Sequence, residues 1–135
     1  MSEVSLEVKE LFAVAFKHQN KNEFLQAENI YKKILNISPN DIATLNNLGN
    51  VLRVLKKYKE SIYYFDKALN IKPRDIITNY NLGLLFYKLE EFEKSAAFYK
   101  KVVEIDSKHV QSYHNLMDIY EKTNNHKKLE SIIKK

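Results

Sequence analysis

The stretch TLNNLG at residues 44–49 returns as TNYNLG at 78–83 and, with more changes, as SYHNLM at 112–117. Each copy begins 34 residues after the previous one. A fixed period of this size indicates an array of equal structural units, each too small to bury a core alone. We therefore divide the chain into four repeats after a short N-terminal extension of the first helix at residues 1–7, with boundaries at 8–41, 42–75, 76–109 and 110–135.

Each repeat is predicted to form two helices. In the second repeat, Leu45, Leu48 and Leu52 recur at spacings of three and four, which places them on one face of a helix. Ile62 and Phe65 begin a similar stripe in the second half of the same repeat. The polar stretch between the two stripes, RVLKKYKE at 53–60, is predicted to be the turn.

Both prolines and both glycines obey the 34-residue period. Pro39 and Pro73 follow the second helix of a repeat and end it. The segments that contain them, SPND at 38–41 and KPRD at 72–75, then offer Asn or Asp to cap the next helix. Gly49 and Gly83 fall in the middle of a helix, where glycine costs about 1 kcal/mol relative to alanine. We therefore expect the paired helix to approach closely at each glycine. The residues expected opposite this column are small: Ala27, Ser61 and Ser95.

These columns resemble the tetratricopeptide repeat (TPR) family, whose signature combines a 34-residue period with the order L-G…Y…A…F…P. The second repeat matches best, at Leu45, Leu48, Gly49, Leu52, Ser61, Phe65, Ala68 and Pro73. The third repeat departs at Asn79, Val102 and Ser107, and the fourth matches only at Tyr113, Leu116 and Tyr120. The resemblance implies an all-α, right-handed solenoid of antiparallel helix hairpins whose last repeat is truncated, with the first helix of each repeat lining a concave groove.

By this resemblance, one face of each first helix would contact a bound peptide. The predicted peptide-binding residues are Phe12, Phe16, Asn46, Asn47, Asn50, Arg53, Ile77, Tyr80, Asn81, Leu84, Tyr87, Lys88, His114 and Asn115. Three of them form a ladder with one rung per repeat, similar to the asparagine ladder of O-GlcNAc transferase: Asn47, Asn81 and Asn115.

An asparagine amide donates and accepts hydrogen bonds at once, as a peptide backbone requires. With helices about 10 Å apart and an extended peptide rising about 3.3 Å per residue, each rung would meet the backbone about every third residue. Alternatively, these asparagines only bond neighbouring helices. The aromatic and aliphatic candidates form an exposed patch typical of binding sites. That patch could instead be covered by residues 1–7 or by a second copy of the chain.

The carboxylate clamp, with which some TPR proteins hold acidic chaperone tails, requires lysine and arginine at set groove positions. Over the first three repeats those positions hold Phe12, Phe16, Asn47, Ile77 and Asn81. We therefore do not expect such a tail to bind. The formal charge is uneven, however, because residues 42–75 carry +4 of the net +5. A basic repeat can steer an acidic partner, but a solvated lysine-rich face is the simpler explanation.

The sequence shows no signature of an enzyme, a metal site or a cofactor site. There is no cysteine, no glycine-rich phosphate loop and no His-Glu-x-x-His motif. The histidines lack the i, i+4 spacing of a helical metal site; they are His18, His109, His114 and His126. No apolar run reaches the ~18–20 residues that cross a bilayer, and the acidic N-terminus lacks a signal pattern. We expect a cytoplasmic protein.

The favoured hypothesis is a non-catalytic scaffold or adaptor that binds an extended peptide or protein segment in its groove. The competing hypothesis is a module that self-associates through its groove or its ends, because Leu129, Ile132 and Ile133 lie on a face that a further helix would normally cover. This face would equally suit a fragment of a longer array. Nucleic-acid binding through the basic second repeat is a weaker third hypothesis. The sequence does not identify the partner.

Overall fold

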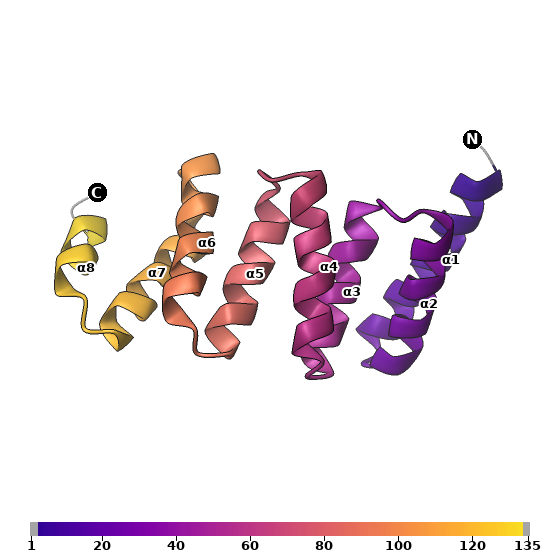
Figure 1. Cartoon of the computed structure of the whole chain (residues 1–135), viewed down its shortest axis with the longest axis horizontal. Coiled ribbons are helices and arrows are strands. Elements are labelled where there is room, and N and C mark those ends of the chain that lie inside the picture. The colour runs from indigo at the N-terminus through magenta and orange to yellow at the C-terminus, as the bar shows by residue number, and fades with distance from the viewer. Residues whose placement is uncertain (1–2, 134–135) are drawn as a thin grey trace. The chain divides into compact units, whose positions relative to one another are not determined.

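The computed structural model describes residues 3–133, with side chains throughout that range except at positions 3, 4 and 126. All regular secondary structure in this range is helical, which confirms the predicted fold class (Figure 1). The helices are α1 (Glu3–Asn20), α2 (Phe24–Ile37), α3 (Ile42–Val54), α4 (Tyr58–Ile71), α5 (Ile76–Lys88), α6 (Phe92–Ile105), α7 (Val110–Lys122) and α8 (His126–Ile133).

The helices keep the period of the sequence. The first helix of the second, third and fourth repeats begins at Ile42, Ile76 and Val110, the residues at which those repeats were predicted to start. Helix α1 begins at Glu3 and so includes most of the predicted extension. Residues 1–2 of that extension lie outside the described residues.

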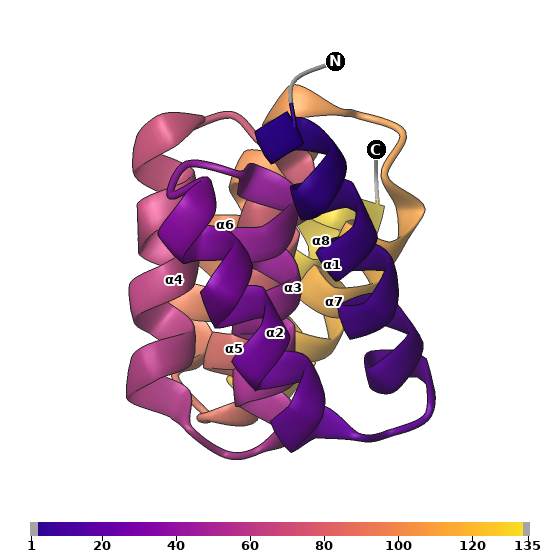
Figure 2. The same ribbon diagram turned by 90° about the vertical axis from the view of Figure 1, so that its right-hand side faces the viewer.

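The chain divides into two compact units, Met1–Pro73 and Arg74–Lys135. The N-terminal unit contains two helix hairpins, and Figure 2 shows the first of them, in which α1 and α2 run antiparallel from a turn at the bottom of the view. Its core comprises Ala15, Ala27, Tyr31, Ile34, Leu48, Val51 and Leu52. The C-terminal unit contains the other two hairpins, and its core comprises Ala96, Tyr99, Leu116, Ile119 and Tyr120.

An aspartate precedes each of the helices α3 and α5, and the side chain of one of the two caps its helix. The Asp75 side chain accepts a hydrogen bond from the Thr78 backbone N–H at 2.9 Å, as predicted for a cap. Asp41 differs, because its carboxylate accepts from the Thr44 hydroxyl and makes no side-chain cap bond to the backbone.

The glycine column lies where the two helices of a hairpin approach closely, as predicted. A Cβ added to Gly49 would lie 2.5 Å from the Phe65 ring, and one added to Gly83 would lie 2.6 Å from the Tyr99 ring. The serines of the second helix, expected opposite the glycines, hydrogen-bond the glycine carbonyls. Ser61 Oγ donates to the Gly49 carbonyl and Ser95 Oγ donates to the Gly83 carbonyl, each at 2.7 Å. An aromatic ring therefore fills the space that each glycine leaves free.

The turn within each repeat is shorter than predicted. Of the stretch 53–60, only residues 55–57 lie outside α3 and α4. Lys56 adopts a left-handed φ of 63°, its N–H bonds the Arg53 carbonyl, and the Lys57 N–H bonds the Leu52 carbonyl. This pair of bonds is the Schellman motif, which ends a helix within two residues. The left-handed conformation recurs at the same position of every repeat, at Asn22, Lys56, Glu90 and Asn124.

Lysine is strained in this conformation, whereas glycine is not. We predict that Lys56→Gly raises the free energy of unfolding by about 1 kcal/mol. The control is Lys33→Gly, an exposed position in the middle of α2, which should lower it by about 1 kcal/mol. Urea denaturation followed by circular dichroism measures both. A loss of stability in both variants would show that the turn does not require the left-handed conformation.

Candidate functional site

In the N-terminal unit, the asparagine of the ladder contacts a buried tyrosine. Asn47 lies half-buried on α3 and donates a hydrogen bond to the Tyr31 hydroxyl, which in turn donates to Gln19 Oε1 at 2.6 Å. Burial raises the pKa of Tyr31 to about 12, although the bond from Asn47 acts in the opposite direction. The predicted rung thus also links the first repeat to the second.

The C-terminal unit repeats this arrangement. Asn115 Nδ2 donates to the Tyr80 hydroxyl at 3.2 Å, and Asn115 also hydrogen-bonds Tyr99. Burial raises the pKa of Tyr99 above its ordinary value. Asn81 is only 7% exposed. Asn47 and Asn115 therefore both bond the tyrosine that stands 16 positions earlier, so the alternative role, bonding neighbouring helices, is real for these two.

The remaining polar candidates of α3 differ in exposure. Asn46 is only 4% exposed, and its Nδ2 donates to the Ile42 carbonyl of its own helix at 3.3 Å. Asn50 and Arg53 are half-buried. Among the described residues, Asn50 Oδ1 and Arg53 Nε are buried atoms with no hydrogen-bond partner. Asn46 therefore faces away from solvent, whereas Asn50 and Arg53 have polar groups left to satisfy.

The apolar candidates are exposed to different degrees. Ile77 is 62% exposed and Phe16 is 45% exposed. Phe12 is half-buried, stacked on Phe16 with ring centroids 6.3 Å apart and edge-on to Tyr31 at 5.7 Å. Tyr80, Leu84 and Tyr87 are also half-buried. Among the apolar candidates, Phe16 in the N-terminal unit and Ile77 in the C-terminal unit are thus the ones exposed to solvent.

Charged groups surround Tyr87 in the C-terminal unit. Its hydroxyl donates to Asp118, and Lys122 Nζ lies 5.2 Å from the centroid of its ring. Tyr87 and the Asp118 carboxylate raise the pKa of Lys122. The two other candidates in this unit, Lys88 and His114, are exposed.

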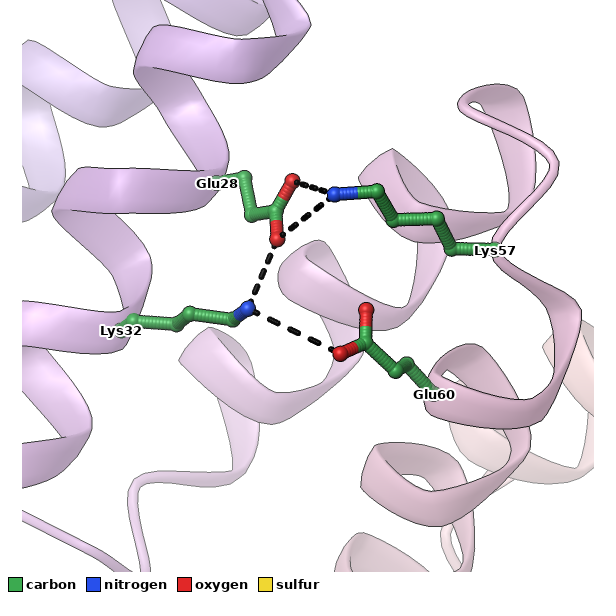
Figure 3. A network of polar contacts seen from close by, with 4 residues as sticks. All are labelled: Glu28, Lys32, Lys57 and Glu60. Atoms are coloured by element: carbon green, nitrogen blue, oxygen red, sulfur yellow. Dashed lines mark hydrogen bonds and ion pairs between the residues drawn. The ribbon is translucent and has the colours of Figure 1, made fainter.

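An ionic network centred on the buried carboxylate of Glu28 joins the two repeats of the N-terminal unit, and the column pattern did not predict it (Figure 3). Glu28 is 4% exposed and receives Lys32 Nζ at 2.7 Å and Lys57 Nζ at 2.9 Å. Lys32 also lies 4.0 Å from Glu60. The sequence contained a signal for this network, because the acidic Glu28 occupies a column that holds the apolar Ile62 in the next repeat.

The surroundings of Glu28 determine its pKa. Burial alone would raise that pKa, but hydrogen bonds from Lys32 and Lys57, together with their positive charges, hold it below its ordinary value. The carboxylate therefore stays ionised and keeps both lysines in place near neutral pH.

Residues 3–133 show no other sign of a chemical site. Within this range, no group of histidine and acidic side chains gathers closely enough to hold a metal ion. None of its helices combines the length and the apolar composition that a bilayer crossing requires.

Comparisons with known proteins agree with this architecture. The family model described as a tetratricopeptide repeat matches residues 40–108. No curated protein matches the chain in sequence. MamA from Desulfovibrio magneticus RS-1 is 22% identical, with a TM-score of 0.83 over 94% of this chain and 72% of that one.

Two further solved structures share the fold. The first TPR of Spaghetti (RPAP3), bound to the HSP90 peptide SRMEEVD, is 17% identical, with a TM-score of 0.83 over 89% of this chain and 95% of that one. A mutant of Thermobaculum terrenum O-GlcNAc transferase is 18% identical, with a TM-score of 0.80 over 89% of this chain and 23% of that one.

The Glu28 network predicts a pH dependence of stability. Because the pKa of Glu28 is lower in the folded state, its contribution is present above pH about 4.5 and is lost as the pH falls through the folded value. Glu28→Gln should lower the free energy of unfolding by about 1–3 kcal/mol at pH 7. That difference should shrink below pH 4.5. Thermal unfolding from pH 3 to 8 measures it, with exposed Glu10→Gln as the control. A difference that is constant with pH would contradict the ionic role.

Proposed function

The chain belongs to the tetratricopeptide repeat family, and from that membership we propose that it is a non-catalytic interaction module, an adaptor or scaffold, that holds an extended segment of a partner protein along the first helices of its repeats. The observation that carries this proposal is the asparagine at the same position of three consecutive first helices, Asn47, Asn81 and Asn115. The proposed contact surface consists of these residues and the neighbouring aromatic and aliphatic side chains of the same helices.

The amides have the chemistry to bind a peptide backbone. An asparagine side chain has two N–H donors and a carbonyl acceptor, so one hydrogen bond to a tyrosine does not exhaust it. The bonds of Asn47 to Tyr31 and of Asn115 to Tyr99 also restrict how each amide turns. A side chain that is already oriented loses less conformational entropy when a ligand binds. The hydrogen bonds that join neighbouring repeats thus also reduce the entropy cost of binding a peptide through Asn47 and Asn115.

The second support is the unsatisfied polar pair on α3. Asn50 Oδ1 and Arg53 Nε lie one helical turn apart, and both lack a hydrogen-bond partner among the described residues. Buried polar atoms without a partner are costly and rare. A peptide N–H could bond the acceptor and a peptide carbonyl could bond the donor. We propose that both atoms bond to the same segment as Asn47.

The exposed apolar residues would select the sequence of the segment. Phe16 and Ile77 offer solvent-exposed side chains, one in each unit. Large apolar side chains that lose water on binding dominate the energy of most interfaces. We propose that the partner segment carries apolar residues that bury Phe16 and Ile77, while the asparagines bind its backbone regardless of sequence.

The chemistry of the partner differs from that of an acidic chaperone tail. The related Spaghetti (RPAP3) repeat was solved with an HSP90 peptide, but here Phe12, Phe16 and Ile77 occupy positions where a carboxylate clamp needs basic residues. An acidic segment remains compatible with the basic second repeat, residues 42–75. The positive surface charge of this repeat would then steer an acidic segment towards the chain, without a clamp that holds a carboxylate.

One observation favours self-association as a second candidate. Ile133 is 63% exposed, although it occupies the column in which Tyr31, Phe65 and Tyr99 are fully buried. A second copy of the chain would cover this face. The average mass in solution would then rise with protein concentration.

The proposal predicts which asparagines matter. Changing Asn47, Asn81 and Asn115 together to alanine should weaken binding by up to several kcal/mol, at about 0.5–1.5 kcal/mol for each lost hydrogen bond. The matched control is Asn36→Ala with Asn70→Ala, two exposed asparagines that share one column of the second helices. Affinity capture from a lysate of the source cells compares both variants with the original chain, after circular dichroism has shown that each is folded.

Proteins that are lost with the ladder variant and retained with the control would identify the partner and locate its site. If the ladder variant captured the same proteins as the original chain and the control variant, binding through the ladder would be contradicted. Capture of the chain alone would favour the self-association candidate.

A further inference from the structure

A cavity of about 360 Å³ lies in the C-terminal unit, among residues of α6, α7 and α8. Its apolar lining includes Val103, Leu116, Tyr120 and Ile132. Volumes of this order are typical of small-molecule sites, which combine apolar walls with a few polar groups. None of these residues belongs to the peptide-binding set, so the cavity is independent of the proposed function.

The repeat pattern explains why the cavity exists. Ile132 occupies the column that holds Phe98 one repeat earlier, and Tyr120 occupies the column that holds Phe86. Phe98 stacks on Phe86 with centroids 5.7 Å apart and planes 1° apart. In the last repeat an isoleucine stands where the stacking phenylalanine would be. The cavity beside Tyr120 therefore lies at the position that the ring of Phe98 occupies in the preceding repeat.

The last hairpin also lacks the contact between a ring and a glycine that the second and third repeats have. Met117 stands in the glycine column and Leu129 stands in the column of Ser61 and Ser95. Methionine leaves no space for a ring, and leucine cannot donate a hydrogen bond to the opposite carbonyl. The last hairpin therefore has neither the ring–glycine contact nor the serine hydrogen bond of the second and third repeats.

Two ammonium groups flank the ring of Tyr120. Lys100 Nζ and Lys128 Nζ each lie 5.8 Å from the ring centroid. Both lysines line the cavity, and both also line an adjoining cavity of about 420 Å³ that shares Tyr120 with it. One carboxylate, Glu104, lines the first cavity as well. The lining of the cavity therefore carries a net positive charge, and the Tyr120 residue beside it is only 5% exposed.

We propose that this cavity binds a small aromatic anion, whose planar ring lies against Val103, Leu116 and Ile132 and whose carboxylate or sulfonate lies between Lys100 and Lys128. The apolar lining supplies the contact for the ring of the ligand. The charge of the two lysines selects an acid over a neutral ring, because charge-assisted bonds are stronger than neutral ones. Glu104 disfavours ligands with a second negative charge on its side of the cavity.

The test uses 1-anilinonaphthalene-8-sulfonate, an aromatic sulfonate that fluoresces in apolar surroundings, as the probe. We expect saturable binding of one molecule per chain. Ile132→Phe should weaken it at least tenfold, because the new ring fills the space. The same variant should melt at an equal or higher temperature, which separates loss of the site from loss of the fold.

Charge is tested separately. Lys100→Gln with Lys128→Gln should weaken binding at least tenfold, whereas Lys101→Gln with Lys127→Gln, on neighbouring positions that do not line the cavity, should leave it unchanged. The neutral analogue N-phenyl-1-naphthylamine should bind at least tenfold more weakly than the sulfonate. Equal binding of the neutral analogue would overturn the anion preference.

A second measurement locates the probe even if Ile132→Phe does not fold. In methyl NMR spectra, the signals of Val103, Leu116 and Ile132 should shift on titration, and those of Val14 and Leu25 in the N-terminal unit should not. Shifts spread over both units would show non-specific binding and would overturn the proposal, as would undiminished binding to a folded Ile132→Phe variant.

Discussion

The contact on which each complete hairpin of the second and third repeats depends is an aromatic ring lying against a glycine. Phe65 and Tyr99 lie where a Cβ on Gly49 or Gly83 would be, so the two helices of each hairpin pack more closely than a larger residue would allow. Ser61 and Ser95 then satisfy the glycine carbonyls in the same buried place. This contact determines the rotation of the first helix, and therefore which of its residues remain available to a ligand.

The same contact bears on both proposed sites. In the third repeat, the tyrosine that lies against the glycine also receives the asparagine of the following repeat, as Tyr99 receives Asn115. Where Met117 replaces the glycine and Ile132 replaces the stacking ring, the last hairpin leaves a cavity. The asparagine column thus follows the 34-residue period, whereas the cavity lies where two other columns of that period change residue type.

Much of the fold could be predicted because it follows the period: Ile42, Ile76 and Val110 begin helices as the repeats require. The turn length was overestimated, because the left-handed residue is Lys56 in one repeat and Glu90 in another, and neither residue type signals this conformation. The candidate site was predictable only as a set of positions on a helix. That Asn46 is buried, that Asn47 bonds Tyr31 and that Glu28 joins two lysines depend on contacts between repeats, which a column pattern does not contain.

The most direct test of the central claim, that the asparagine column binds a peptide backbone, is to follow the side-chain amide signals of the chain by ¹⁵N NMR while a captured partner segment is added. We predict that the signals of Asn47, Asn81 and Asn115 shift together and saturate at one ratio of segment to chain, and that those of Asn36 and Asn70 stay in place. Shifts confined to α8 or to the second helices, with the three ladder amides unmoved, would contradict it.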